Sequence, residues 1–257
     1  MTSEVWSNPV ISRSIHTSIE ATLSARGHAR PARHGRPRGR FDRWRSAATV
    51  DGCHDDRMSQ PTFAELLALD GVDEECELRG RFGFMAFHGG GLEEMTDVIA
   101  KAAAHRSEAS YYGVIHPPDW ELHLPSTRVA PAESELLAAF IEHVDVVITV
   151  HGFGRWSLMT SLLLGGRNRD LAAHVAAHLR TALPAYDVLD DLADIPKELR
   201  GIHERNPVNL PTDAGVQIEL PPRVRGSSPM WWDWEGGLTP HTEALIAALA
   251  GAAASYS

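Results

Sequence analysis

The sequence predicts an α/β protein, a three-layer sandwich built on a mostly parallel mixed sheet. From residue 58 onward, short apolar runs alternate with segments of helical periodicity, a pattern typical of βαβ units. Hydrophobic residues make up 43% of the chain, enough for a full core. No apolar stretch approaches the roughly 18 residues that would span a bilayer. These observations favour a globular domain and exclude a protein built from transmembrane helices.

Short helices and strands are predicted in the first half of this domain. Residues 62–69 are predicted to form a helix, because Thr62 is a suitable N-cap and Glu65 completes a capping box three residues later. Residues 93–104 place apolar side chains at helical spacing, which predicts a second helix. Strands are expected where apolar residues run together or alternate, at 76–78, 84–87, 111–115 and 121–124.

The second half continues the alternation. Residues 145–150 form an almost unbroken apolar run, as in a strand buried on both faces. Residues 158–164 and 216–220 are two further strands, the first closed by a pair of glycines. Helices are expected at 131–143, 168–182 and 239–250, where apolar residues recur every three or four positions.

Charge divides the chain after residue 57. Residues 1–57 hold ten arginines and six acidic residues, whereas residues 58–257 carry a net charge of −14. Eight of the arginines lie between Arg26 and Arg45 with almost no aliphatic residues, so this segment cannot bury enough apolar surface to fold. We predict a disordered Arg-rich tail over 1–57 and a single α/β catalytic domain over 58–257. The tail is either a solvated segment, a basic arm for nucleic acid or an anionic surface, or the product of a start site placed upstream of Met58.

The start of the sequence lacks the basic and then apolar order of a secretory signal, so the cytoplasm is the expected compartment. The chain has two cysteines, Cys53 and Cys76, too few for a disulfide framework or a four-cysteine zinc site. We interpret Cys76 as a buried strand residue.

Two histidines, His88 and His151, directly follow predicted strands, and each is followed by glycine. In an open α/β sheet, ligands bind just beyond the carboxyl ends of the strands. Glu93 lies five residues after His88, and the three intervening glycines after the histidine can fold the chain back tightly. We expect Glu93 to open the following helix, where the helix dipole favours a carboxylate. Two imidazoles and one carboxylate predict a zinc site with an open fourth position, although a single histidine after a strand is usually a polar residue at a loop mouth.

Glu219 is a second acid of interest. Strand alternation places Gln217 and Glu219 on one face and the aliphatic residues on the other. A carboxylate on a mostly buried strand needs a partner, and a metal-bound water is one, which makes Glu219 a candidate general base. Alternatively, the strand lies at a sheet edge with its polar face in solvent, because Pro221 and Pro222 follow directly.

Three blocks of the sequence, residues 87–93, 148–152 and 215–220, resemble the poly-γ-glutamate hydrolase family of phages and bacteria. Residues 122–127 and 164–166 also match stretches of that family, and the similarity spans residues 62–225. A His-Gly-Gly-Gly string alone is a weak signal, but three ordered blocks ending in a Gln-x-Glu strand are fairly specific. The resemblance implies a zinc carboxypeptidase-like fold, a zinc ion held by His88, Glu93 and His151, Glu219 as the general base, and hydrolysis of γ-glutamyl amide bonds.

Substrate contacts are expected from basic residues in loops near these blocks. A planar guanidinium can bind a carboxylate in a bidentate way. We expect Arg155 to be the first such residue, since it follows His151 closely. The other candidates are Arg128, Arg167, Arg205, His123 and His203.

The expected partner is a polymeric or small γ-glutamyl substrate, with no membrane, and with nucleic acid only through the basic tail. Two alternatives stay open. One is a zinc amidohydrolase or carboxypeptidase acting on a small acylated amino acid or on a peptidoglycan γ-glutamyl link. The other is a non-catalytic binding protein on the same fold. The Gly-x-x-x-x-Gly-Lys-Ser/Thr motif of a nucleotide-binding loop is absent from the sequence.

Overall fold

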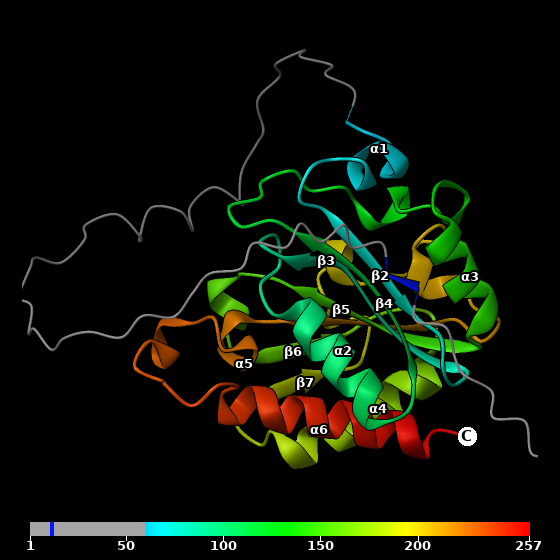
Figure 1. Ribbon diagram of the computed structural model, residues 1–257. Helices are drawn as coiled ribbons and strands as arrows, with labels where there is room; N and C mark the ends of the chain where they lie inside the picture. The colour runs from blue at the N-terminus through cyan, green and yellow to red at the C-terminus, as the bar shows by residue number, and fades with distance from the viewer. Residues whose placement is uncertain (1–10, 13–59) are drawn as a thin grey trace, which may run out of the picture. The chain divides into compact units, whose positions relative to one another are not determined.

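The computed structural model describes residues 11–12 and 60–257 (Figure 1). Most of the predicted tail and Met58 lie outside the described residues, so the division at residue 57 stays a prediction. In the described part of the chain, no helix is both long and apolar enough to cross a membrane.

The centre of the fold is one mixed sheet with the strand order β1-β2-β4-β3-β5-β8-β6-β7. Its central strands β4, β3, β5 and β8 are parallel, whereas the β1–β2, β2–β4 and β8–β6 pairs are antiparallel and β6–β7 is parallel. The strands are β1 (Ile11–Ser12), β2 (Asp73–Glu77), β3 (Phe82–Gly90), β4 (Ser110–His116), β5 (Val146–Gly152), β6 (Ser161–Leu164), β7 (Asp187–Leu189) and β8 (Gly215–Leu220). The predicted α/β class with a mostly parallel mixed sheet is confirmed.

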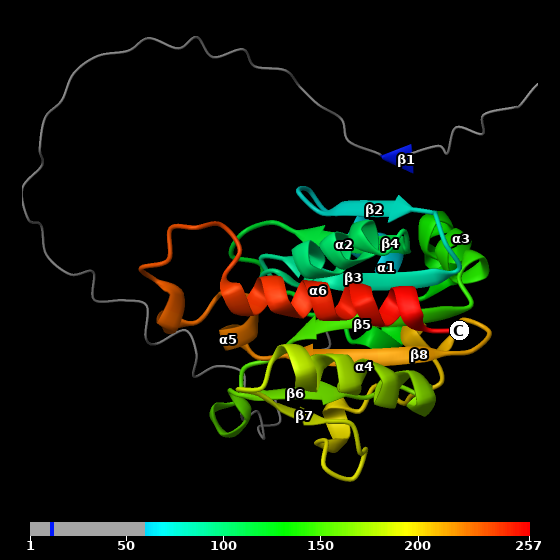
Figure 2. The ribbon, with the colours of Figure 1, turned by 90° about the horizontal axis from the view of Figure 1, so that it is seen from below.

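Helices cover both faces of the sheet. On one face, α2 (Thr96–Arg106), α4 (Arg169–Ala182) and α6 (Pro240–Ser255) share one apolar core with the strands. Figure 2 shows α6 running roughly along the direction of the strands, with α2 and α4 to either side of it. On the opposite face, α1 (Phe63–Leu67) and α3 (Glu135–His143) bury Phe63 and Phe140 in a second core. The three layers match the predicted sandwich, and the short α5 (Pro222–Arg225) follows β8.

Several predicted elements are confirmed with shifted ends. Thr62 caps α1 and forms the predicted capping box with Glu65. Asn168 and Thr239 cap α4 and α6, so the predicted starts of those helices are correct to within one residue. Cys76 is buried in β2 as predicted. Residues 121–124 are not a strand, β6 begins at Ser161, and β7 and α5 were not predicted.

Both histidine-bearing strands are longer than predicted. β3 continues through His88, because a register shift between Ala86 and Gly89 restores its pairing with β4. β5 likewise continues through His151, which pairs with β8. The two histidines are therefore held within the ends of strands, and the backbone of the sheet fixes where they point.

The predicted start of α2 was wrong. The helix begins at Thr96, and Glu93 lies in the turn before it. The Glu93 N–H donates to the His88 carbonyl (2.8 Å), which closes the turn. Met95 has a φ of 73°, a left-handed conformation that no continuous helix contains. The turn directs the Glu93 side chain back toward His88. The two side chains meet because Glu93 lies in this turn and not in the helix.

Candidate metal centre and active site

The candidate site lies at the carboxyl ends of the central parallel strands. His151 on β5 and Glu219 on β8 are partners in the parallel ladder, so their side chains emerge on the same face of the sheet. His88 lies on β3, and its ring is 5.0 Å from that of His151 between centroids. His88, His151 and Glu219 are all buried. The alternative of a solvent-facing edge strand for Glu219 is wrong, because β8 lies between β5 and β6.

The Glu93 carboxylate lies between two imidazoles. Its Oε1 is 2.9 Å from Nδ1 of His88, and its Oε2 is 3.3 Å from Nδ1 of His151. Oε2 also accepts a hydrogen bond from the Gly152 N–H (2.8 Å). The structure thus brings together the three residues that the sequence predicted as metal ligands.

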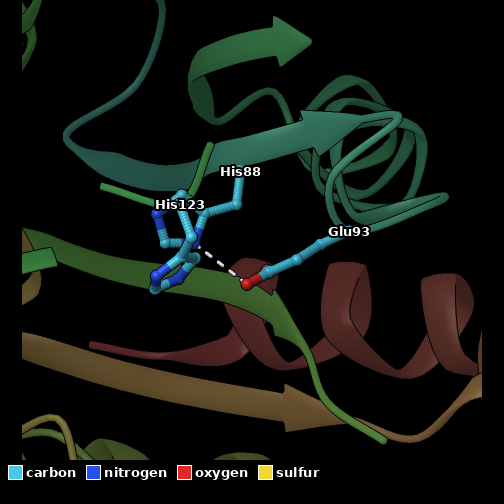
Figure 3. Close-up of side chains that lie close together, drawn as sticks. All are labelled: His88, Glu93 and His123. Atoms are coloured by element: carbon cyan, nitrogen blue, oxygen red, sulfur yellow. Dashed lines mark hydrogen bonds and ion pairs between the residues drawn. The ribbon is translucent and has the colours of Figure 1, made fainter. Parts of the chain in front are cut away.

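A fourth group, His123, joins this cluster from the loop after β4. Figure 3 shows the His88 and His123 rings side by side, with Glu93 reaching toward His88. One ligand atom each from His88, Glu93 and His123 lie within 4.8 Å of one another, a spacing that suits a metal ion. His123 is exposed to solvent, unlike His88 and His151. The sequence placed His123 among the substrate contacts, and the structure places it at the open side of the cluster.

The charges of the cluster are strongly coupled. Burial alone would raise the pKa of Glu93, but the imidazoles of His88 and His151 outweigh it and hold this pKa well below its ordinary value. Burial raises the pKa of Glu219 to about 7, with His151 opposing the shift and the Glu93 charge adding to it. Gln217 donates from Nε2 to Glu219 Oε1 (2.8 Å), and Asn206 Nδ2 in turn donates to Gln217 Oε1 (2.8 Å). This chain of amides fixes the orientation of the Glu219 carboxylate.

The hydrogen bonds around the imidazoles fit a metal ion. His88 Nε2 contacts the Leu124 carbonyl (2.9 Å), which can only accept, so Nε2 carries the proton. Nδ1 faces Glu93 Oε1, so a cation bound between these two atoms would displace the Nδ1 proton, with the Leu124 carbonyl orienting the ring. Nε2 of His151 is buried with no hydrogen-bond partner among the described residues. An orphaned buried nitrogen beside two acids indicates that an ion or water belongs in this site.

The arginines predicted to contact substrate have other partners, or line surface hollows, in this structure. Arg155 pairs with Glu198 (2.5 Å), and Arg128 donates to the backbone carbonyls of Gln60 and Pro61. Arg167 lines an open surface hollow of about 550 Å³ together with His203. Arg128 also lines a second hollow with Arg205. Among the described residues, no hydrogen bond or ion pair joins these side chains to the His88–Glu93 cluster.

Sequence analysis missed Arg225, a buried basic residue close to the cluster. It ends α5, and its guanidinium lies against Gly152, next to His151. Burial lowers its pKa, whereas the charges of Glu93, Glu94 and Glu219 act in the opposite direction. Its only sequence signal was an arginine placed six residues after Glu219.

Buried imidazoles and carboxylates at the carboxyl ends of the strands of an α/β sandwich are the arrangement expected of an enzyme active site. The chain belongs to the poly-gamma-glutamate hydrolase family, whose profile matches residues 68–229. No curated protein sequence matches the chain significantly.

Solved structures agree on the fold. A bacteriophage poly-gamma-glutamate hydrolase is 17% identical, with a TM-score of 0.61, and the match covers 72% of this chain and 89% of that one. The zinc-free apo form of YNDL is 20% identical, with a TM-score of 0.55, over 70% of this chain and 89% of that one. Both similarities confirm the architecture that the resemblance implied.

Proposed function

We propose that this protein is a zinc-dependent hydrolase of amide bonds, acting on γ-glutamyl linkages of the kind found in poly-γ-glutamate. One observation carries the proposal: His88 and His151 face the same Glu93 carboxylate, and Glu219 is in register beside His151. Two imidazoles and one carboxylate make a zinc site that leaves a position for water or substrate. Zinc bound there would polarise the scissile carbonyl and lower the pKa of a water molecule.

The protein residues have separate roles. His88, Glu93 and His151 would hold the metal, and the Leu124 carbonyl accepts from Nε2 of His88, so that Nδ1 would be the ligand atom. The Glu219 carboxylate accepts a proton from the attacking water and delivers it to the nitrogen of the leaving amine. Gln217 and Asn206 hold that carboxylate in place. His123, on the exposed side, contacts the substrate.

A short γ-glutamyl substrate is the second candidate. Arg155 is paired with Glu198 and Arg128 with backbone carbonyls, so neither offers a free guanidinium to a polymer of carboxylates. This favours a substrate with few charges, such as an acylated amino acid or a peptidoglycan γ-glutamyl link. A panel of poly-γ-glutamate, γ-glutamyl dipeptides and α-linked glutamate peptides distinguishes the two, because the amide linkage and the length vary independently.

The test combines metal analysis with one substitution. Purified protein should contain about one equivalent of zinc, lose activity with a chelator and regain it with zinc. Glu219→Gln should retain the metal and lose about 10²- to 10⁴-fold in kcat, the range typical of a general base. The matched control is Glu142→Gln, which alters an exposed acid near the end of α3, before the amino-terminal end of β5 and so at the opposite edge of the sheet from the site. Full activity in Glu219→Gln would end the proposed mechanism.

A further inference from the structure

The Arg225 guanidinium touches three segments that are far apart in the sequence. Its Nε donates to the Leu220 carbonyl (3.1 Å), and its Nη1 donates to the Glu94 carbonyl. Its Cζ lies so close to Gly152 that a Cβ at that position would approach it to 2.8 Å. The residue is only 6% exposed.

These three contacts follow one pattern. Each contacted residue comes immediately after a residue of the proposed site, and those site residues are Glu93, His151 and Glu219. One planar side chain therefore joins the turn before α2, the end of β5 and the end of β8. The approach of the guanidinium also explains why glycine follows His151, since any side chain at Gly152 would displace it.

We propose that Arg225 is the positioning residue of this site, and that it sets the relative placement of the metal-binding turn, the second histidine strand and the acid strand. The inference rests on the proposed zinc site and adds a residue to it. A buried guanidinium is costly unless its N–H groups are satisfied and charges of opposite sign are near. Two backbone carbonyls accept hydrogen bonds from two N–H groups of Arg225. The negative charges of Glu93, Glu94 and Glu219 oppose the loss of the guanidinium proton.

The geometry requires arginine in particular. The fork of a guanidinium presents several N–H donors in one plane, whereas a lysine ammonium is a single point at the end of a flexible stem. Lysine would keep the positive charge but could not hold the Leu220 and Glu94 carbonyls in the same way. Methionine would keep most of the volume and lose both the charge and the donors. The two substitutions therefore separate positioning from charge.

The experiment measures zinc affinity by chelator competition on the full-length protein, for wild type, Arg225→Lys and Arg225→Met. We expect both variants to bind zinc about 10- to 100-fold more weakly, the loss typical of a residue that orients metal ligands. The absorption spectrum of the cobalt-substituted protein should also change in both, a readout independent of turnover. If charge alone mattered, Arg225→Met would bind zinc more tightly and Arg225→Lys would match wild type, and this result would overturn the proposal.

Arg169→Met is the matched control. Arg169 also donates to backbone carbonyls, those of Leu164, Gly165, Gly166 and Asp190, around the carboxyl end of β6, and none of these four residues is a proposed metal ligand or adjoins one in the sequence. Its loss should lower the melting temperature and leave the zinc affinity and the cobalt spectrum unchanged. An equal loss of zinc affinity in Arg169→Met would assign the effect of Arg225 to general stability and refute the positioning role.

A second variant tests the same contact from the other side and does not require Arg225→Met to fold well. Gly152→Ala should weaken zinc binding in the wild-type background, because the new methyl group displaces the guanidinium. In the Arg225→Lys background the same change should cost much less, since the planar group is gone. Additive losses would overturn the proposal. A wild-type protein that binds no zinc would instead contradict the proposed function.

Discussion

Two histidines compete for the place beside His88 and Glu93. His151 is buried, and its Nδ1 lies 3.3 Å from Glu93 Oε2, whereas His123 is exposed on the open side. We expect His151→Ala to lose more zinc affinity than the 10- to 100-fold typical of an orienting residue, because it removes a direct ligand. His123→Ala should keep its zinc and raise KM. Metal analysis and steady-state kinetics of the two variants check this, and zinc lost from His123→Ala but kept by His151→Ala would reverse the two roles.

The positions of some site residues could be predicted from the sequence, and those of others could not. His88, His151 and Glu219 could be predicted to converge, because the ends of parallel strands meet at one edge of a sheet whatever the exact strand order. His123 could not be placed, since its position depends on an irregular loop. Arg225 was also missed, because its partners are backbone carbonyls, those of Leu220 nearby in the sequence and of Glu94 far from it, and such contacts leave no side-chain pattern.

At the scale of elements, α2 is held against β2 by charged side chains. Glu77 on β2 contacts Lys101 and His105 on α2, as well as Arg79. Burial alone would raise the pKa of Glu77, but the partners His105, Lys101 and Arg79 outweigh it, so the pKa in the folded protein is lowered. A carboxylate of this kind stabilises the fold in its ionised form.

Glu77→Gln should therefore lower the free energy of unfolding by about 1 kcal/mol at pH 7. The folded pKa lies below the unfolded value of about 4.3, so the stabilisation is full above that pH. It is lost as pH falls through the folded pKa, and the wild type and the variant should then become equally stable. Denaturant unfolding at pH 7 and in acid measures this difference, with Glu121→Gln, an exposed acid, as control. A difference that persisted unchanged in acid would show that packing, not charge, links Glu77 to α2.

Elements were easier to predict than their ends. The capping box at Thr62 marked the start of α1 correctly, because the signal is local. The start of α2 was missed, since apolar spacing continues back through Met95 although its backbone is left-handed. The ends of β3 and β5 were missed because ladder pairs with β4 and β8 extend them, and such pairing is tertiary.

For the whole molecule, the sequence could predict the α/β class but not the strand order. Alternating elements predict parallel strands with helical crossovers. The antiparallel placement of β6 against β8, and of β2 against β4, depends on which edges remain free after the central strands have paired. Neither composition nor periodicity contains that information. The prediction of the site did not depend on the order of the outer strands, because its strand residues lie on the adjacent central strands β3, β5 and β8.

The charge of the domain gives a prediction about substrate approach. Residues 58–257 carry a net charge of −14, so a polyanionic substrate meets repulsion at long range, and salt screens it within a Debye length of about 10 Å at 0.1 M. We expect kcat/KM for poly-γ-glutamate to rise as salt increases from low ionic strength, because weaker repulsion speeds encounter. For a neutral γ-glutamyl amide of the same scissile bond, kcat/KM should stay flat, which serves as the control for salt effects on the enzyme itself. A fall with salt for the polymer alone would mean that local cations dominate its approach, and Arg167, beside an open hollow, would be the first residue to substitute.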